Sequence, residues 1–175
     1  MTDDTTATEP DHPVVIALKA LHPDRGWLTR GDQAALRRAR PDQCAGSALF
    51  RFLAHLRGEG RFMPDHGDER DEAERRWTVI LGAACRLAHI KGTSVGHALA
   101  DAGFADLRLE RLLASSGIDF LRDLDRAVRF LDGKSAGCDL FSLYRLVMAD
   151  DQRAERERRQ LARDFFARRH QNAKS

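Results

Sequence analysis

Closely spaced arginines are the residues of this sequence best suited to chemistry, and the chemistry that they suit is phosphate binding. Arg122, Arg126 and Arg129 recur at i, i+4 and i+7, a spacing that places them along one side of a helix. A guanidinium can hold a phosphate through two parallel hydrogen bonds, and it stays charged at physiological pH. The pattern therefore predicts a basic ridge that contacts the backbone of a nucleic acid.

Other basic residues extend this candidate set. Arg108 and Arg111 form an i, i+3 pair on the preceding predicted helix, and four more stand on earlier segments. The competing interpretation is a solvated face, in which Asp119, Asp123 and Asp125 pair with the ridge; periodicity alone leaves both interpretations open. The candidate nucleic-acid-binding residues are Arg37, Arg38, Arg40, Lys91, Arg108, Arg111, Arg122, Arg126 and Arg129.

Motifs that support catalysis or metal binding do not occur in the sequence. It contains no nucleophile elbow, phosphate-binding loop or zinc-protease motif. Cys85 and His89 have the i, i+4 spacing of helical ligands, but two ligands do not make a zinc site. Because Cys85 adjoins an apolar stripe, we interpret it as a core thiol near a hydrogen-bonded imidazole. We expect no enzymatic activity, no metal and no cofactor.

The charge of the chain is unevenly distributed. The 175 residues carry a net charge of +2, from 29 basic and 27 acidic side chains. Residues 1–11 contain four acidic residues and no basic one, so the rest of the chain carries +6. Of the 29 basic residues, 25 are arginine. Arginine is favoured at phosphate contacts, although a GC-rich genome produces the same bias.

Cysteine content and hydropathy indicate the compartment. Cys44, Cys85 and Cys138 are an odd number at unrelated spacings, which fits neither a disulfide framework nor a metal-binding knuckle. The chain opens without a signal peptide, and no apolar run approaches the roughly 20 residues needed to span a bilayer. We expect a cytoplasmic protein without a membrane partner.

The hydrophobic pattern is helical almost throughout. Apolar residues follow helical spacing in successive segments, and no segment alternates as a strand would. The sequence therefore predicts an all-α fold, a compact elongated bundle of eight to nine helices. A disordered acidic arm is expected over 1–13 and a single helical domain over 14–172. The predicted helices are 14–22, 32–40, 47–57, 68–91, 94–102, 106–115, 118–131, 139–149 and 153–170.

Capping and packing residues refine this prediction. Aspartate and serine side chains commonly cap helix N-termini. We therefore expect helix caps at Asp32, Ser94 and Asp106, and we expect a helix to start at Asp139. Gly96 and its neighbour Ala98 would allow a close approach between helices.

One stretch, "GTSVGHALADAGFADLRLERLL" at 92–113, resembles the characteristic motif of the CasB family, the small subunit of the type I-E CRISPR Cascade effector. The motif runs Gly, any residue, Ser, an aliphatic residue, Gly, any residue, Ala-Leu-Ala, and then a turn and an arginine-bearing helix. "ALRRA" at 35–39 looks like an early Arg-Arg element of the family, and "RERRQLARDFF" at 156–166 is similar to its closing basic helix. The resemblance covers most of 14–170.

This resemblance implies an elongated all-helical subunit without enzymatic activity, present as two copies in a crRNA-guided antiviral complex. Its implied partners are the crRNA-containing Cascade subunits, a second copy of itself and the target DNA, above all the displaced strand. Carried over by residue, Arg37 and Arg38 match the early element, Arg108 and Arg111 the helix after the glycine motif, and Arg126 the next helix. Arg40, Lys91, Arg122 and Arg129 are added because they would lie nearby.

Two other functions stay open at this point. Residues 94–115 could form the helix-turn-helix of a free-standing DNA-binding regulator, but leucines would leave only Arg108, Glu110 and Arg111 to face a groove of the DNA. That is a small set for reading bases. A structural adaptor that binds only protein subunits would make the arginines incidental.

Overall fold

The computed structural model describes residues 11–43, 46–61, 64 and 66–174, and within them the chain is all-α. The predicted class and the predicted eight to nine helices are confirmed. The expected arm over 1–13 lies largely outside the described residues, as does Cys44. The helices are α1 (Pro13–Ala20), α2 (Arg30–Arg38), α3 (Ser47–Gly58), α4 (Gly67–Ala84), α5 (Val95–Asp101), α6 (Asp106–Ala114), α7 (Gly117–Gly133), α8 (Leu140–Met148) and α9 (Asp151–Asn172).

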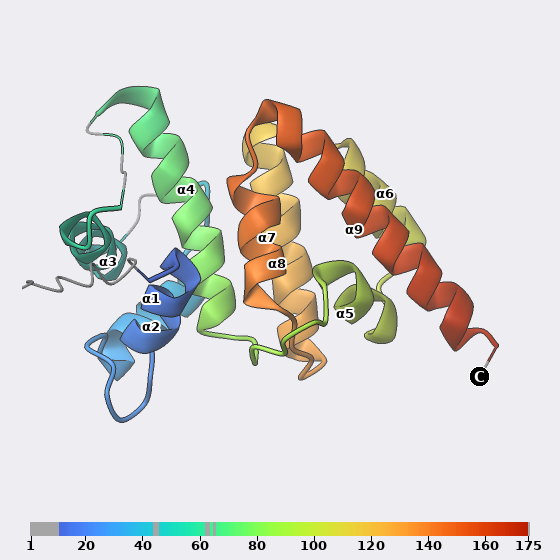
Figure 1. Ribbon diagram of the computed structural model, residues 1–175, viewed down its shortest axis with the longest axis horizontal. Helices are drawn as coiled ribbons and strands as arrows, with labels where there is room; N and C mark the ends of the chain where they lie inside the picture. Colours follow the sequence, from blue (N-terminus) through green and yellow to red (C-terminus); the bar gives the residue numbers. More distant parts are fainter. Residues whose placement is uncertain (1–10, 44–45, 62–63, 65, 175) are drawn as a thin grey trace, which may run out of the picture.

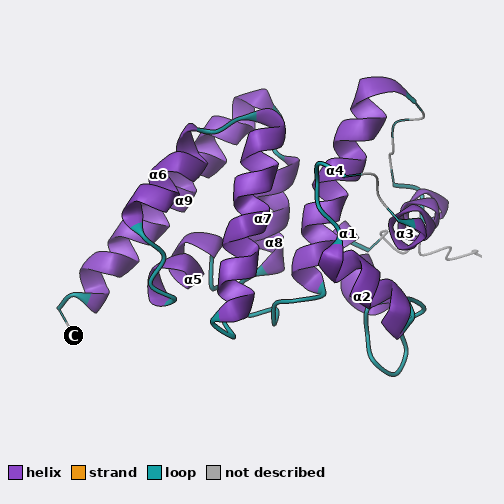
Figure 2. Ribbon diagram, turned by 180° about the vertical axis from the view of Figure 1, so that it is seen from behind, coloured by secondary structure: helices purple, strands orange, loops and turns teal. Residues whose placement is uncertain are grey.

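The molecule is elongated, with α1 to α3 at one end and α5, α6 and α9 at the other (Figure 1). Helices α7 and α8 lie beside α4 in the middle, in both views (Figure 2). Buried side chains form one cluster that extends from Val14 in α1 to Phe165 in α9. Within the described residues, no helix is both long enough and apolar enough to cross a bilayer.

The glycine motif at 92–98 forms a turn at Gly92 and the predicted cap at Ser94. Gly92 has a φ of 82°, a conformation that glycine adopts without steric cost. The Ser94 hydroxyl accepts a hydrogen bond from the His97 backbone N–H, 3.3 Å away, and so caps α5. A Cβ atom at Gly96 would lie 2.5 Å from the Leu161 carbonyl oxygen. Only glycine therefore allows α5 to pack this closely against α9.

Two of the predicted caps are wrong, and both errors have a local cause. The N-cap of α2 is Thr29, whereas Asp32 is the third helical residue and accepts a hydrogen bond from the Thr29 backbone N–H at 3.0 Å. The two residues form a capping box. Asp106 is the first residue of α6 after Ala105, and its side chain makes no cap hydrogen bond. Ser94 caps α5 as predicted, and α8 starts directly after Asp139, which is its N-cap.

The helix predicted over 68–91 ends at Ala84. Beyond it, the backbone pairs with a distant segment: Ile90 N–H donates to the Cys138 carbonyl at 3.0 Å, and Cys138 N–H donates to the Ala88 carbonyl at 3.1 Å. A Cβ atom at Gly137 would lie 2.4 Å from the Ala88 oxygen. This tertiary pairing replaces the last two turns of the helix that the local pattern favours.

Candidate nucleic-acid interface

The arginine ridge predicted on α7 is present, and its members differ in exposure. Leu121, Leu124 and Val128 are buried against the core, and the three arginines lie on another side of the helix. The exposed fractions of the side chains are 40% for Arg122, 59% for Arg126 and 27% for Arg129.

Each arginine of the ridge pairs with an aspartate on its own helix, as the competing interpretation expects. Arg122 Nη1 lies 2.9 Å from Asp119 Oδ1, and Arg126 Nη1 lies 2.6 Å from Asp123 Oδ1. The third pair joins Arg129 Nε to Asp125 Oδ2 at 2.8 Å. A phosphate would have to compete with these carboxylates. The other residues around each arginine therefore decide whether that arginine can bind a phosphate.

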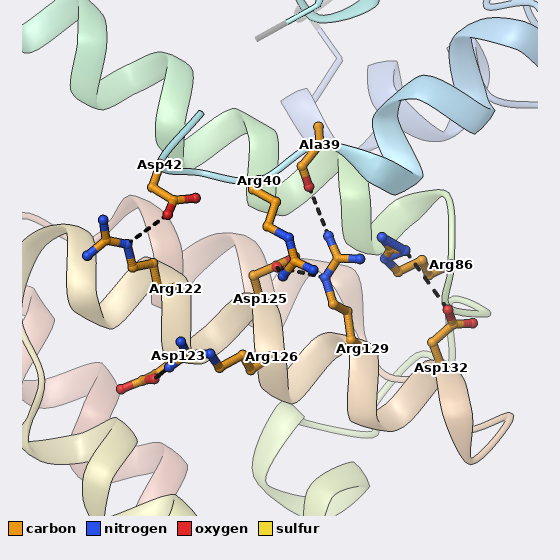
Figure 3. Close-up of polar contacts among 10 residues, drawn as sticks. All are labelled: Ala39, Arg40, Asp42, Arg86, Arg122, Asp123, Asp125, Arg126, Arg129 and Asp132. Carbon is orange, nitrogen blue, oxygen red and sulfur yellow. Dashed lines mark hydrogen bonds and ion pairs between the residues drawn. The ribbon is translucent and has the colours of Figure 1, made fainter. Parts of the chain in front are cut away.

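A network of polar contacts ties α7 to the segment after α2 (Figure 3). Arg129 Nη2 donates to the Ala39 carbonyl oxygen at 2.9 Å. Asp125, whose side chain is 7% exposed, also lies 3.6 Å from Arg40 Nη1. We name the contacts among Ala39, Arg40, Asp125 and Arg129 the α2–α7 junction. Because Arg129 bonds both its own helix and the α2 segment, it holds two parts of the fold together.

A neighbouring arginine is more deeply buried. The Arg86 side chain is 5% exposed, and its Nη1 lies 3.9 Å from Asp132 Oδ2. Burial lowers the pKa of Arg86, and the positive charge of Arg129 lowers it further, while Asp125 and Asp132 oppose this shift. Within the described residues, its Nε has no hydrogen-bond partner. Arg86 therefore extends the polar layer between α4 and α7.

A groove of about 630 Å³ opens beside the junction, and we name it the mixed-charge groove. It brings together four of the arginines predicted from sequence with four carboxylates, so the charges of its lining cancel. Arg122 Nε lies 3.2 Å from Asp42 Oδ2 across it. The charged residues that line it are Arg40, Asp42, Arg111, Asp119, Arg122, Asp123, Asp125 and Arg126.

A second groove of about 300 Å³ lies between α6 and α7, and we name it the aromatic groove. Its lining residues are Phe104, Arg108, Arg111, Asp123, Arg126 and Phe130. Three arginines face one carboxylate there, which leaves two uncompensated positive charges. Arg111 Nε lies 3.4 Å from Asp123 Oδ2, whereas the guanidinium of Arg108 has no partner within the part of the chain that the structure describes.

Four candidates line neither groove, and one of them is Arg129 of the α2–α7 junction. Arg37 Nε donates to the Cys85 carbonyl oxygen at 2.6 Å, so it closes the C-terminal end of α4. Arg38 and Lys91 are exposed at the end of α2 and in the segment after α4. Of the nine predicted residues, the structure therefore brings together Arg40, Arg108, Arg111, Arg122 and Arg126, and Arg129 stands at the junction behind them.

The interpretation of Cys85 as a core thiol is confirmed. The residue is buried, and burial raises the pKa of its thiol to about 11. The Nδ1 atom of His89 accepts a hydrogen bond from the Leu140 N–H at 3.1 Å. Burial likewise raises the pKa of Cys138 to about 12. Among the described residues, no three cysteine, histidine or acidic side chains lie close enough to hold a metal ion.

Sequence reasoning missed Arg86, Asp125 as an inter-helix contact, and the two phenylalanines. A signal existed for Asp125, because it stands four residues after Leu121 and three before Val128, which places a carboxylate on the core-facing side of α7. Phe104 and Phe130 are 26 residues apart, and nothing in their local pattern indicates that they meet.

Comparisons with known proteins identify the family. The sequence profile described as CRISPR-associated protein Cse2 matches residues 32–166. The fold matches a chain in the crystal structure of E. coli Cascade bound to a PAM-containing dsDNA target, with a TM-score of 0.62 and 23% identity, over 93% of this chain and 99% of that one. No curated protein matches this chain. The resemblance of residues 92–113 is thus confirmed: the chain belongs to the Cse2 (CasB) family of CRISPR-associated proteins.

Proposed function

We propose that this chain is a non-catalytic subunit of a crRNA-guided Cascade complex and that it holds the backbone of the opened target DNA, including the displaced strand. Membership of the Cse2 family supports this proposal, as does the fold shared with a chain of a DNA-bound Cascade. Its partners would be crRNA-containing subunits, the target DNA and a second copy of itself.

The observation that carries the proposal is the convergence of Arg108, Arg111 and Arg126 from two helices on one groove. Within the described part of the chain, Asp123 is the one acidic residue that opposes them there, so a phosphate would add the negative charge that the groove lacks. Arg40 and Arg122 line the adjoining mixed-charge groove. A strand that crosses from one groove to the other would thus meet further guanidiniums, which can bind phosphate oxygens in pairs.

Contacts of this kind stabilise a strand without reading its sequence. In a guide-directed complex the guide RNA reads the target by base pairing, and the protein needs only to hold the backbone. Backbone contacts by arginine are electrostatic, and they weaken as salt rises. We therefore expect the purified protein to bind unrelated oligonucleotides with similar affinity, more weakly at higher salt, and not to cleave them with or without Mn²⁺.

Replacing Arg108, Arg111 and Arg126 together by alanine tests the proposal. Each lost phosphate contact should flatten the plot of log affinity against log salt by roughly 0.7–0.9. Affinity for single-stranded DNA should therefore fall sharply at low salt, and the slope should decrease by about 2 units. Binding by fluorescence anisotropy at several salt concentrations measures both effects.

The matched control removes the same charge from α9, through Arg153, Arg156 and Arg159, which are all exposed. Arg158 is unsuitable, because its guanidinium packs 4.6 Å from the centroid of the Phe120 ring. The control variant should keep most of the affinity. Equal losses in both variants would mean diffuse attraction by net charge and would contradict the proposed groove.

A further inference from the structure

The lining of the aromatic groove includes two phenylalanine rings as well as its arginines, and phosphate binding alone does not use these rings. Phe104 comes from the turn before α6 and is 5% exposed, and Phe130 comes from α7 and is half-buried. Their ring centroids lie 5.1 Å apart, with the planes inclined at 67°. The two rings therefore form one continuous apolar part of the lining, to which both sides of the groove contribute.

The groove has an aromatic end and a charged end. On the α6 side the order along the chain is Phe104, Arg108, Arg111, and on the α7 side it is Asp123, Arg126, Phe130. The rings touch at the start of one series and the end of the other. At the opposite ends, Arg111 Nε lies 3.4 Å from Asp123 Oδ2. The two series thus run in opposite directions, with both rings together and the charged pair at the other end.

We propose that this groove binds one nucleotide of a nucleic-acid strand, with its base against Phe130 and its phosphate among the three guanidiniums. The proposal rests on the proposed function, and it adds a base subsite to the backbone contacts. A volume of about 300 Å³ is at the small end of the range for ligand pockets. It therefore suits one nucleotide better than several stacked ones.

The aromatic rings of the groove are compatible with binding that does not depend on the nucleotide sequence. Every base has a π face, so stacking on an aromatic side chain tolerates any base. Among the described residues, Asp123 is the one carboxylate that lines the groove, and it already pairs with Arg111 and Arg126. Few free groups thus remain to read the edge of a base. The subsite would therefore prefer a strand with bases to a strand without them, and it would not distinguish one base from another.

The test compares two single-stranded probes of equal length and charge, oligothymidylate and an abasic oligomer. The wild-type protein should prefer the probe with bases by roughly 5- to 140-fold, which is the effect of stacking one base on an aromatic ring. Phe130→Leu should lose most of this preference while its affinity for the abasic probe stays the same. Phe130→Tyr, which keeps the ring, should retain the preference.

Unchanged binding of the abasic probe also shows that Phe130→Leu is folded. The matched control is Phe50→Leu, which removes an exposed ring from α3 and should leave the preference intact. If Phe130→Leu keeps the full preference, or weakens both probes equally, the base subsite is wrong. If the triple arginine variant binds like the wild type, the proposed function fails instead, so the two failures are distinguishable.

Free thymidine monophosphate separates a strand subsite from a site for a soluble nucleotide. It should compete with oligothymidylate only at far higher concentration, because it lacks the neighbouring phosphates that Arg40 and Arg122 would contact. Equal affinity of the mononucleotide and the oligomer would overturn the strand assignment.

Discussion

The mixed-charge groove and the aromatic groove share Arg111, Asp123 and Arg126, yet they differ in what surrounds these residues. In the larger groove four arginines meet four aspartates. In the smaller one three arginines meet one aspartate and two phenylalanine rings. The number of arginines therefore does not identify a phosphate site. We infer that the excess of arginines over carboxylates is the better guide, and by that measure the smaller groove is the stronger candidate.

The aspartates of the larger groove also have a structural role. Asp125 is nearly buried, and it contacts Arg129 on its own helix and Arg40 on the segment after α2. Arg129 in turn donates to the Ala39 carbonyl. These contacts join the α1–α4 end of the molecule to α7. We therefore expect the junction to contribute mainly to stability and the aromatic groove to contribute mainly to binding.

The largest expected effect is on stability, from Asp125→Ala. The change leaves Arg129 and Arg40 without their shared carboxylate and removes a charge-assisted hydrogen bond. We expect a loss of about 2–3 kcal/mol in the free energy of unfolding, less than for a fully buried pair because both arginines keep some solvent contact. For a chain of this size the melting temperature should fall by roughly 4–12 °C, as measured by circular dichroism.

Asp119→Ala is the matched control. Its side chain is 69% exposed and pairs only at the surface with Arg122, so the melting temperature should hardly change. A similar fall in both variants would mean that the junction has no special role and that aspartates anywhere on α7 act through general electrostatics.

Arg129→Ala should distinguish the role of the junction in stability from the role of the aromatic groove in binding. It removes the bonds to Asp125 and to the Ala39 carbonyl, and we expect a loss of about 1–2 kcal/mol in stability. Arg129 lines neither groove, so its loss should change the affinity for single-stranded DNA by less than about twofold once the variant is folded. Arg126→Ala, which changes both grooves, should weaken binding more. The reverse order of affinities would place the phosphate site at the junction.

The contrast between local and distant contacts also explains how much the sequence could predict. Most of the helices, the Ser94 cap and the close approach at Gly96 depend on neighbouring residues, and the sequence predicts all three. The pairing of Arg126 with Asp123 is likewise one of the two interpretations that the sequence offers, because these residues stand at i+3 and i on one helix.

Contacts between distant segments could not be predicted in this way. Arg129 reaches Ala39 across 90 residues of chain. The end of α4 is set by the pairing of Ile90 with Cys138, so the helical pattern of its own residues misleads. Whether a carboxylate compensates the charge of an arginine thus depends on the packed fold rather than on the spacing of the arginines.

The smallest predicted effect concerns the α6 side of the aromatic groove. Surface contacts with α9 support this side. Asp101 Oδ1 lies 2.8 Å from Arg168 Nε and accepts a second hydrogen bond from Asn172 Nδ2, so it attaches α5 to α9. At the start of α6, Asp106 Oδ1 lies 3.3 Å from Arg169 Nη2. Exposed pairs of this kind contribute little to stability. The α6 side should therefore depend less on any single carboxylate than the junction depends on Asp125.

Asp101→Asn measures this contribution through its pH dependence. The hydrogen bond from Arg168 holds the pKa of Asp101 below its ordinary value of 3.8, burial opposes the shift, and Asn172 reinforces it. Since the folded pKa is the lower one, the stabilisation is complete above about pH 4 and is lost as the pH falls through the folded value. Because the side chain is 40% exposed, the difference in free energy of unfolding between wild type and Asp101→Asn should be under about 1 kcal/mol at neutral pH.

Urea denaturation at several pH values should show this difference shrinking in acid, since the amide does not titrate. A difference as large as that for Asp125→Ala, or one that grows as the pH falls, would contradict the contrast between a buried junction and a surface-supported groove.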